Sequence, residues 1–534
     1  RYQSVEKLNQ EMGSQYHSFA ELKPLPLEMA RKQNALPLWI EYNRFFEERF
    51  LDYFKVMLQL ARQQDLNGKA YLGPDGFGRL DPFEFCGMYE LLQTVNYFNL
   101  YTYQAPPQME IGRSLLQYCP NVSFRSIYAG SYGSQYMNYE FMRSIPWFML
   151  LHGYNGFFWY MGNGKLSYSS EGCLAFMPDL RPSEGFMVAA EQIQEMRKGT
   201  ANLVAVSKRR HDGIAVLYSN DSVAAATVDK QENLLRQSLS TLQQILEDTG
   251  LQYDYIPPEK IEDGALQENY RLLFLPCILS LSENCLAGIE RFVQAGGMVI
   301  ADQMPGKYDG LLRKGPQEKL QDRFAAKQEW RLFDWKNYGR LRRQAKAGKA
   351  RREEILELMQ GKLTRLSSFA ENGLPNVEKI EYELPGAGLL LAALNYSAEE
   401  QALQLELPGD KFVYDLRQGQ ELGQLTERQL TMRGGEVQIF ALLDEKLPET
   451  KIELLPKTES DPDFRLLCNN GRQSNAYYLQ GFDAAGNERA EYADTVLNNE
   501  VYTLRPALND PRGTWTIKVR EAISGKISQI QVKR

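Results

Sequence analysis

The sequence has few cysteines and lacks any long apolar run. Its six cysteines in 534 residues form no C-x₂-C pair, which argues against a zinc site and against a dense disulfide framework. No stretch of about 20 apolar residues could span a bilayer, and the first residues lack the apolar core of a signal peptide. We therefore predict no membrane span, no metal and no cofactor. Because the chain starts at Arg1 rather than methionine, an export signal upstream stays open, and we favour a secreted or periplasmic location over a cytoplasmic one.

An excess of positive charge is also missing. The chain has 61 Lys and Arg against 68 Asp and Glu, a net charge of −7 and a pI near 5.5. Nucleic-acid binders carry concentrated positive surface, so we expect no nucleic-acid partner. Residues 316–370 are rich in Lys, Arg, Glu and Gln, and we interpret them as a charged helical segment with a solvated face or a subunit contact.

The alternation of helix and strand patterns predicts an α/β multidomain protein. Residues 1–200 begin with a long amphipathic helix, Leu38 to Gln64, and continue with four βα units. We predict parallel strands at residues 69–73, 95–101, 123–130 and 156–161, because parallel strands need crossover helices. Four such units correspond to half of a (β/α)₈ TIM barrel, unless the sheet is open and doubly wound.

Three further domains follow. Residues 204–315 alternate buried strands with helices and predict a flavodoxin-like α/β domain. It contains no G-x-G-x-x-G, so no nucleotide site is expected, and we interpret Cys277 as a buried thiol. Residues 375–446 predict a small antiparallel β domain, and residues 458–534 an immunoglobulin-like β-sandwich with Gly/Asn turns.

Candidate site residues come from the ends of the barrel strands, where barrel enzymes place their active sites. Aromatic side chains with polar tips suit sugar rings. The predicted substrate-binding residues are Tyr101, Tyr103, Ser131, Tyr132, Trp159 and Tyr160. His152 is interpreted as a structural residue at a helix-to-strand turn. Ser131 lacks the G-x-S-x-G context of a hydrolase nucleophile.

Two carboxylates are candidates for catalysis. Asp75 stands at a predicted strand exit, although Pro-Asp-Gly is also an ordinary β-turn sequence. Glu140 falls in the first turn of a predicted helix, where the helix dipole favours an acid without any catalytic role. Both residues are kept as candidates with these structural alternatives.

Three stretches carry a resemblance to a known family. "YQSVEKLNQEMGSQYHSF" matches a family segment at Tyr2, Ser4, Leu8, Asn9, Gly13 and Tyr16, with Met12 in place of Trp. "IPWFMLLHGYNGFFWYM" is similar to its last barrel helix and strand, with the His152–Gly153 pair. "YRLLFLPCILSLSENCLAGIERFVQAGGMVIADQMPGKYDGLL" matches a third segment that includes Gly306 and Asp309. Residues 1 to about 445 thus resemble the C-terminal portion of family 42 glycoside hydrolases, which are β-galactosidases.

This resemblance implies an activity and an assembly. It implies a carbohydrate substrate, a Rossmann-like trimerisation domain at residues 204–315, and a homo-oligomer, with a trimer preferred over a dimer. It also implies that the acid/base Glu precedes Arg1 and that the nucleophile position is held by Ala129, Gly130 or Ser131 rather than by Glu. We therefore expect a glycoside hydrolase with an atypical site, the alternative being a non-catalytic glycan-binding or assembly protein.

Overall fold

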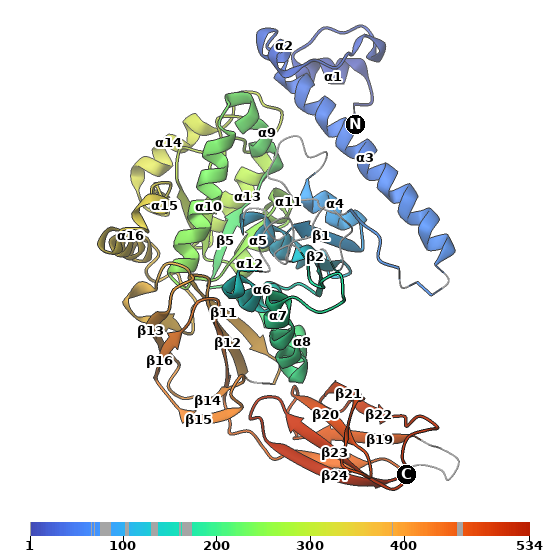
Figure 1. Ribbon diagram of the computed structural model, residues 1–534. Helices are drawn as coiled ribbons and strands as arrows, with labels where there is room; N and C mark the ends of the chain where they lie inside the picture. Colours follow the sequence, from blue (N-terminus) through green and yellow to red (C-terminus); the bar gives the residue numbers. More distant parts are fainter. Residues whose placement is uncertain are drawn as a thin grey trace. The chain divides into compact units, whose positions relative to one another are not determined.

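The computed structural model describes residues 2–65, 67–68, 70–74, 87–101, 106–129, 137–159, 162, 174–386, 388–456 and 463–534 (Figure 1). The contacts divide the chain into two compact units. The first holds residues 1–127, 212–246 and 253–364, and the second holds residues 128–211, 247–252 and 365–534. No helix among the described residues is both long enough and apolar enough to cross a membrane.

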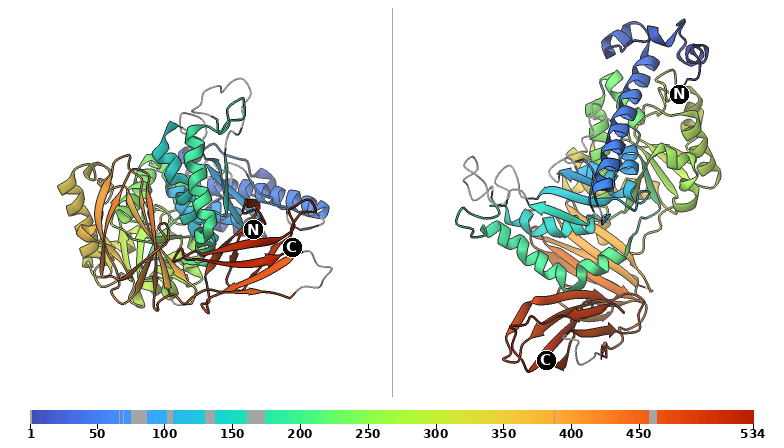
Figure 2. Two further views of the ribbon diagram at one scale, coloured as in Figure 1. Left: turned by 60° about the horizontal axis from the view of Figure 1, so that its bottom comes forward. Right: turned by 90° about the vertical axis from the view of Figure 1, so that its right-hand side faces the viewer.

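The first unit begins with the helices α1 (Val5–Met12), η1 (Phe19–Glu21), α2 (Leu27–Lys32) and α3 (Leu36–Gln64). The helix predicted from Leu38 to Gln64 is α3, which runs without a break over 29 residues (Figure 2). Several of its apolar residues are exposed, although some of their rings contact one another along the helix. Phe45, Phe46, Tyr53, Val56, Met57 and Leu60 are exposed and fall on one side of the helix at its 3.6-residue period.

The barrel portion forms a sheet in which three strands are described, β1 (Tyr97–Tyr101), β2 (Ser123–Ala129) and β3 (Gly156–Trp159), in that order. β1 and β2 are parallel, with Tyr97 opposite Ser123. The helices α4 (Met88–Thr94) and α5 (Pro106–Leu116) belong to this portion. α5 lies between β1 and β2 in the chain, as the predicted crossover requires.

The strand predicted at residues 69–73 does not form in the described part of that range, residues 70–73. The Asn96 side chain takes the place of a ladder there: its Oδ1 accepts from the Leu72 N–H at 2.7 Å, and its Nδ2 donates to the Ala70 carbonyl at 3.0 Å. These side-chain bonds hold the segment next to β1 without the repeated backbone pairing of a strand. The prediction of a strand was therefore wrong, although the segment does lie beside β1.

The flavodoxin-like sheet of the first unit is parallel, with the order β6-β5-β7-β8-β9. Its strands are β5 (Ile214–Leu217), β6 (Tyr253–Ile256), β7 (Leu272–Leu275), β8 (Met298–Ala301) and β9 (Trp330–Leu332). Its helices are α9 (Asn220–Asp229), α10 (Glu232–Asp248), α11 (Pro258–Glu262), α12 (Ala265–Asn269), α13 (Glu283–Gln294), α14 (Gln317–Ala326), α15 (Tyr338–Leu341) and α16 (Ala345–Leu358). β9 lies inside the segment predicted to be helical, so the sheet extends beyond residue 315.

Alternate residues of these strands face opposite sides, so both faces of the sheet are covered. Leu273 and Leu275 pack into a cluster with Ile289 and Phe292 of α13. Phe274 instead meets Trp335, whose Nε1 donates to the Ser238 carbonyl of α10 at 2.9 Å. All four residues of β5, β6 and β7 are buried, as expected of a parallel sheet between helices.

The second unit contains the barrel helix α6 (Tyr139–Leu151), then α7 (Glu184–Glu195), the π-helix η4 (Met196–Thr200), α8 (Ala201–Val206) and β4 (Lys208–Arg209). Trp147 and Leu151 of α6 share a core with Leu203 of α8 and with Ile380 and Leu394 of the small β domain. These barrel helices therefore rest on a sheet of the β domain.

Two antiparallel β layers make up the predicted small domain. One sheet has the order β10-β13-β16, and the other β15-β14-β17-β12-β11-β4. The strands are β10 (Ser368–Phe369), β11 (Val377–Leu384), β12 (Gly388–Asn395), β13 (Gln401–Glu406), β14 (Phe412–Asp415), β15 (Gln420–Gln424), β16 (Glu427–Met432) and β17 (Val437–Leu443), with η5 (Ala370–Asn372) after β10.

The C-terminal residues form the predicted β-sandwich, with facing sheets β18-β19-β22 and β21-β20-β23-β24 (Figure 2). Its strands are β18 (Lys451–Leu454), β19 (Phe464–Asn469), β20 (Ala476–Phe482), β21 (Glu488–Leu497), β22 (Val501–Leu504), β23 (Thr514–Glu521) and β24 (Ile527–Lys533). Gly199 of η4 has φ of +113°, and a Cβ there would lie 2.5 Å from the Ala522 Cβ. Glycine at this position permits the close approach between η4 and the sandwich.

Candidate functional site

Most of the predicted site residues lie outside the described residues. These are Asp75, Tyr103, Ser131, Tyr132 and Tyr160. Tyr101 is the last residue of β1, as predicted, and its side chain is not among those described. The roles assigned to these residues stay predictions.

Glu140 lies in the first turn of α6, the position expected for it. The helix is capped by Asn138, whose side chain accepts from the Phe141 N–H at 2.9 Å. The turn at Gly434 and Gly435 packs against Glu140 so closely that a Cβ on Gly435 would lie 2.0 Å from the Glu140 carbonyl oxygen. Helix capping and this contact explain the residue's place without catalysis, and the residue is half-buried.

A second acid begins the neighbouring helix. Glu184 opens α7 after the N-cap Ser183, and its Oε2 accepts from the Tyr139 hydroxyl at 2.6 Å. This bond joins the N-terminal ends of α6 and α7, next to Glu140. Sequence reasoning passed over Glu184, although the Ser-Glu pair before an apolar periodic run marks a helix start.

Trp159 is the last residue of β3 and is half-buried. Its ring meets Phe186 of α7 edge to face, with centroids 5.3 Å apart. The two rings border a small cluster around Met142, Ala175 and Ala189. Part of the indole surface is thus used for packing, and the remaining part is what a sugar ring could contact.

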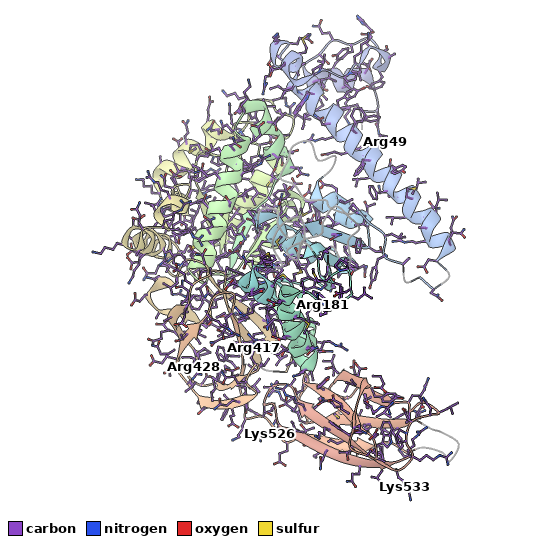
Figure 3. The ribbon with its side chains drawn as sticks, viewed as in Figure 1. Arg49, Arg181, Arg417, Arg428, Lys526 and Lys533 are labelled. Atoms are coloured by element: carbon purple, nitrogen blue, oxygen red, sulfur yellow. The ribbon has the colours of Figure 1, made fainter. Side chains whose placement is uncertain are left out.

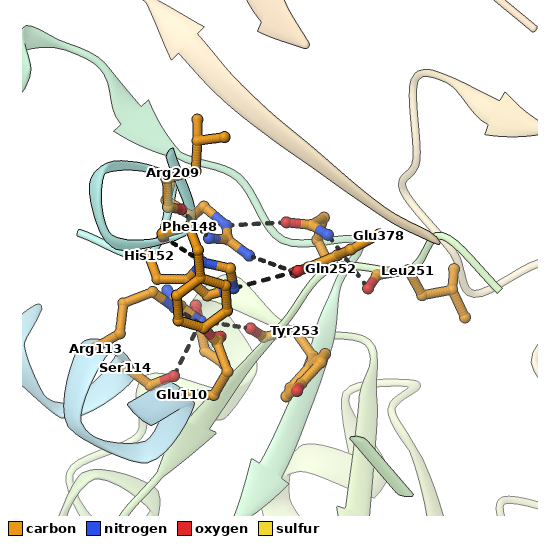
Figure 4. A network of polar contacts seen from close by, with 12 residues as sticks. Glu110, Arg113, Ser114, Phe148, His152, Arg209, Leu251, Gln252, Tyr253 and Glu378 are labelled. Atoms are coloured by element: carbon orange, nitrogen blue, oxygen red, sulfur yellow. Dashed lines mark hydrogen bonds and ion pairs between the residues drawn. The ribbon is translucent and has the colours of Figure 1, made fainter. Parts of the chain in front are cut away.

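His152 has the structural role that its position predicted. The residue is 1% exposed, and its ring stacks on Phe148 with centroids 3.9 Å apart. Nδ1 lies 2.7 Å from the Phe148 carbonyl, which can only accept, so this nitrogen carries a proton. Nε2 faces Glu378 Oε2 at 3.3 Å (Figure 4).

The Glu378 carboxylate connects several elements of the second unit. Arg209 of β4 approaches it at 3.6 Å and also donates to Gln252 Oε1 at 2.9 Å (Figure 4). The Tyr396 hydroxyl donates to the same carboxylate, and burial together with this negative charge raises the pKa of Tyr396. The group is buried and fully engaged, so it holds α6 on the β domain rather than forming a site.

In the first unit, a buried ion-pair triad ties α5 to the flavodoxin-like sheet. Arg113 contacts Glu110 at 2.8 Å, Asp254 at 2.9 Å and the Tyr253 carbonyl at 2.8 Å. Figure 4 shows the contacts of Arg113 with Glu110 and Tyr253. The two neighbouring carboxylates raise the pKa of Arg113 despite its burial.

The first unit also has a cavity of about 460 Å³ at the carboxyl edge of its parallel sheet. The residues that follow β5, β6, β7 and β8 line it, together with Arg44, Tyr89 and Glu90. In the parallel strand order β6-β5-β7-β8, the connection from β5 leads to β6 on one side of β5, whereas the later strands β7 and β8 lie on the other side, and ligands of doubly wound folds bind at such a switch point.

The charges in this cavity oppose the phosphate ligands common at that position. Six carboxylates line the cavity, those of Glu90, Asp221, Glu259, Glu262, Glu283 and Asp309. The first turns of α9 and α13 are already capped by Ser219 and Ser282. No group of three or more such side chains converges into a metal site in the part of the chain that the structure describes. The sequence-based exclusion of a nucleotide agrees with these charges.

Crowding of the acids changes their protonation. Desolvation by the cavity walls, with repulsion from Glu259 and Asp221, raises the pKa of Glu90 to about 7, although the residue is partly open to solvent. The pKa of Glu259 is raised for the same reasons. Arg44 offsets part of this charge by bonding Asp221 at 2.8 Å. Periodicity alone did not reveal these acids, because they come from the helices α4, α9, α11 and α13 and from the loop at Asp309, which are far apart in the chain.

The described cysteines are buried and free. Burial raises the pKa of Cys277 to about 12, which confirms a buried thiol. Its backbone has φ of +47°, and its N–H donates to Asp302 Oδ1 at 2.9 Å.

Comparison with solved structures defines the class of fold. The chain is similar to the apo exo-carrageenase GH42 from Bacteroides ovatus, with TM-score 0.57 and 12% identity, covering 83% of this chain and 61% of that one. It is similar to Gan42B, a GH42 β-galactosidase of G. stearothermophilus, with TM-score 0.60 and 14% identity over 82% of this chain and 73% of the other. For the cold-adapted β-galactosidase of Rahnella sp. R3 the TM-score is 0.57 and the identity 15%, over 83% and 74% of the two chains.

This protein therefore has the fold of family 42 glycoside hydrolases, as its motifs predicted. It spans 61% of the exo-carrageenase chain, so each of these proteins contains chain that has no counterpart here. No family model and no curated protein matches the sequence.

Proposed function

We propose that this chain is part of a glycoside hydrolase that cleaves oligo- or polysaccharide bonds with an atypical site. The observation that carries the proposal is the fold likeness to GH42 enzymes over 82–83% of the chain. Because function resides in the site and not in the fold, the proposal depends on finding carboxylates at the barrel mouth.

Retaining hydrolysis needs two carboxyl groups about 5 to 5.5 Å apart, and inversion needs a wider pair. β2 ends at Ala129, so the strand itself places no acid at the expected nucleophile position. Asp75 is the proposed replacement, with Glu140 second. Glu140 is half-buried and stands beside the Tyr139–Glu184 bond, where it could act on a bound sugar.

The second candidate is a glycan-binding or assembly protein that has lost its nucleophile. The absence of an acid at the end of β2 and the capping role of Glu140 favour it. The aromatic residues predicted at the strand ends would then bind sugar without cleaving it.

Turnover of a panel of aryl glycosides distinguishes the glycoside hydrolase from the non-catalytic glycan-binding or assembly protein. Asp75→Asn and Glu140→Gln keep size and most hydrogen bonding but cannot act as base or nucleophile, so loss of a catalytic carboxylate should lower kcat by about 10² to 10⁴. Glu318→Gln, an exposed acid in the first turn of α14, is the matched control, and Tm checks folding. Unchanged turnover in both variants removes these residues from the mechanism. Oligosaccharide binding without turnover by the wild type supports the second candidate.

A homotrimer and a secreted or periplasmic location complete the proposal. The family resemblance supports the trimer, with the flavodoxin-like domain as the contact. Fractionation of the native host cells would test the location.

A further inference from the structure

The helix α3 carries an exposed stripe of apolar side chains that the proposed function does not use. Six members of this α3 stripe are 49–61% exposed: Phe45, Phe46, Tyr53, Val56, Met57 and Leu60. The half-buried Tyr42 continues the stripe toward the start of the helix, with its ring centroid 5.5 Å from that of Phe46. Because covering contiguous apolar surface is favourable, such a stripe marks a site of interaction.

The spacing along the α3 stripe is that of a coiled-coil seam. Six residues follow one another at intervals of 4, 3, 4, 3 and 4 residues: Tyr42, Phe46, Arg49, Tyr53, Val56 and Leu60. Helices with this repeat pack lengthwise against another helix, since the repeat keeps the seam facing the partner. Arg49 is the charged member of the seam, and it pairs with Asp52 of the same helix at 2.7 Å (Figure 3). The stripe therefore fits a second helix.

The α3 stripe is also symmetric about Leu51. Two antiparallel copies of α3 that cross at this residue place the seam residues of one copy opposite those of the other in these pairs: Tyr42 with Leu60, Phe46 with Val56, and Arg49 with Tyr53. A twofold contact between identical chains requires such a self-complementary pattern. The aromatic end of each stripe then meets the aliphatic end of the other, and the Arg49 guanidinium meets a Tyr53 ring.

The charges of α3 favour the same antiparallel arrangement. From Leu36 to Asp52 the helix has four acids and two cations, whereas from Tyr53 to Gln64 it has two cations and no acid. Antiparallel pairing sets the acidic half of one copy beside the basic half of the other, and parallel pairing would set like charges together. Complementary charge of this kind selects the partner and its direction.

A groove lies beside the aromatic end of the α3 stripe. It has a volume of about 510 Å³, and its lining includes Leu8, Met12, Phe19, Tyr42 and Phe45 of α1, η1 and α3. In the antiparallel pair, the C-terminal end of the second α3 falls opposite Tyr42. Its aliphatic side chains would fill this apolar groove.

We propose that the α3 stripe binds the α3 stripe of a second copy of this chain in an antiparallel pair. The contact lies outside the flavodoxin-like domain, so it is distinct from the proposed trimer contact. A twofold contact through α3 joins two such trimers, and both contacts fit in one assembly. Because one helix face is small beside a standard interface, the pairing needs higher protein concentrations than the trimer does.

The test is sedimentation equilibrium of the wild-type chain from about 1 to about 200 μM, over which we expect the mass to double. The like-charge variant, Phe46→Glu/Val56→Glu, sets two acids opposite each other and should keep the mass of the lowest concentration. The opposite-charge variant, Phe46→Glu/Val56→Lys, changes the same two positions but sets an acid opposite a cation, so it should regain pairing in low salt. Both positions are exposed, and Tm checks that the variants fold.

The proposal fails if the wild-type mass stays constant over this range, or if the like-charge variant doubles its mass as the wild type does. It also fails if the opposite-charge variant pairs no better than the like-charge variant, since a parallel pair would repel in both. Binding of the wild type to phosphatidylcholine vesicles without any doubling of mass would assign the stripe to a lipid surface instead. The doubling is measured against the lowest concentration, so a failure of the proposed trimer leaves this result intact.

Discussion

At the scale of single residues, Glu90 shows how neighbours set a charge. The cavity walls shield its carboxyl group from part of the solvent, and the carboxylates of Glu259 and Asp221 repel its charge. Its pKa of about 7 lies above the value of about 4.3 expected in the unfolded chain. The folded state therefore holds the proton more tightly, and ionisation of Glu90 destabilises it as the pH rises from about 4.3 to 7.

Glu90→Gln should accordingly have little effect on the free energy of unfolding at pH 4.5 and raise it by about 1 kcal/mol at pH 8. The gain is kept small because Glu90 is exposed, so solvent screens the repulsion between the carboxylates. Urea unfolding at the two pH values measures it. Glu283→Gln, which removes another acid from the lining of the same cavity, is the control. An equal rise in the free energy of unfolding at both pH values would contradict the raised pKa of Glu90.

Arg113 is the residue whose loss we expect to cost most. Arg113→Leu leaves Glu110 and Asp254, both buried, without their cation, and should lower the free energy of unfolding by about 3 to 5 kcal/mol. Arg49→Leu provides the comparison, because its pair with Asp52 is exposed and worth about 0 to 1 kcal/mol (Figure 3). Similar losses of unfolding free energy in the two variants would show that the Arg113 triad does not stabilise the packing of α5 on the sheet.

At the scale of elements, the start of α13 depends on one hydroxyl. Ser282 Oγ accepts from the Cys285 N–H at 3.1 Å and contacts Glu262 at 3.2 Å. Ser282→Ala should cost about 1 kcal/mol, the usual value for a lost N-cap. Ser240→Ala, an exposed serine inside α10, should be neutral or slightly stabilising, because alanine has the higher helix propensity. Chemical denaturation of both variants tests the difference.

Some helices and strands could be predicted from the local sequence pattern alone, and others could not. The helix predicted from Leu38 to Gln64 forms as α3, which begins two residues earlier at Leu36 and ends at Gln64, because its apolar residues recur at the helical period. β9 was missed because its three residues become a strand only by pairing with β8. Residues 70–73 likewise depend on a neighbour. The Asn96 side chain bonds to their backbone, and no backbone strand pairing forms there.

At the scale of the whole molecule, self-association is the open prediction. If the flavodoxin-like domain mediates trimerisation, light scattering at micromolar concentration should give three times the 61.3 kDa mass of one chain. Dilution should lower the mass toward that of a single chain by mass action. A monomer at every concentration would contradict the trimer, and a mass of two chains would support the dimer instead.

The sequence by itself determined the mixed α/β class and the family to which the fold is similar, because apolar periodicity, turn residues and three motifs are local properties. It also indicated that His152 is structural and Cys277 buried. Only the tertiary structure decided which groups meet. The acids around Glu90 come from helices far apart in the chain, and the Arg113 triad joins α5 to β6. Charge and burial at such points depend on distances through space, which the order of residues does not state.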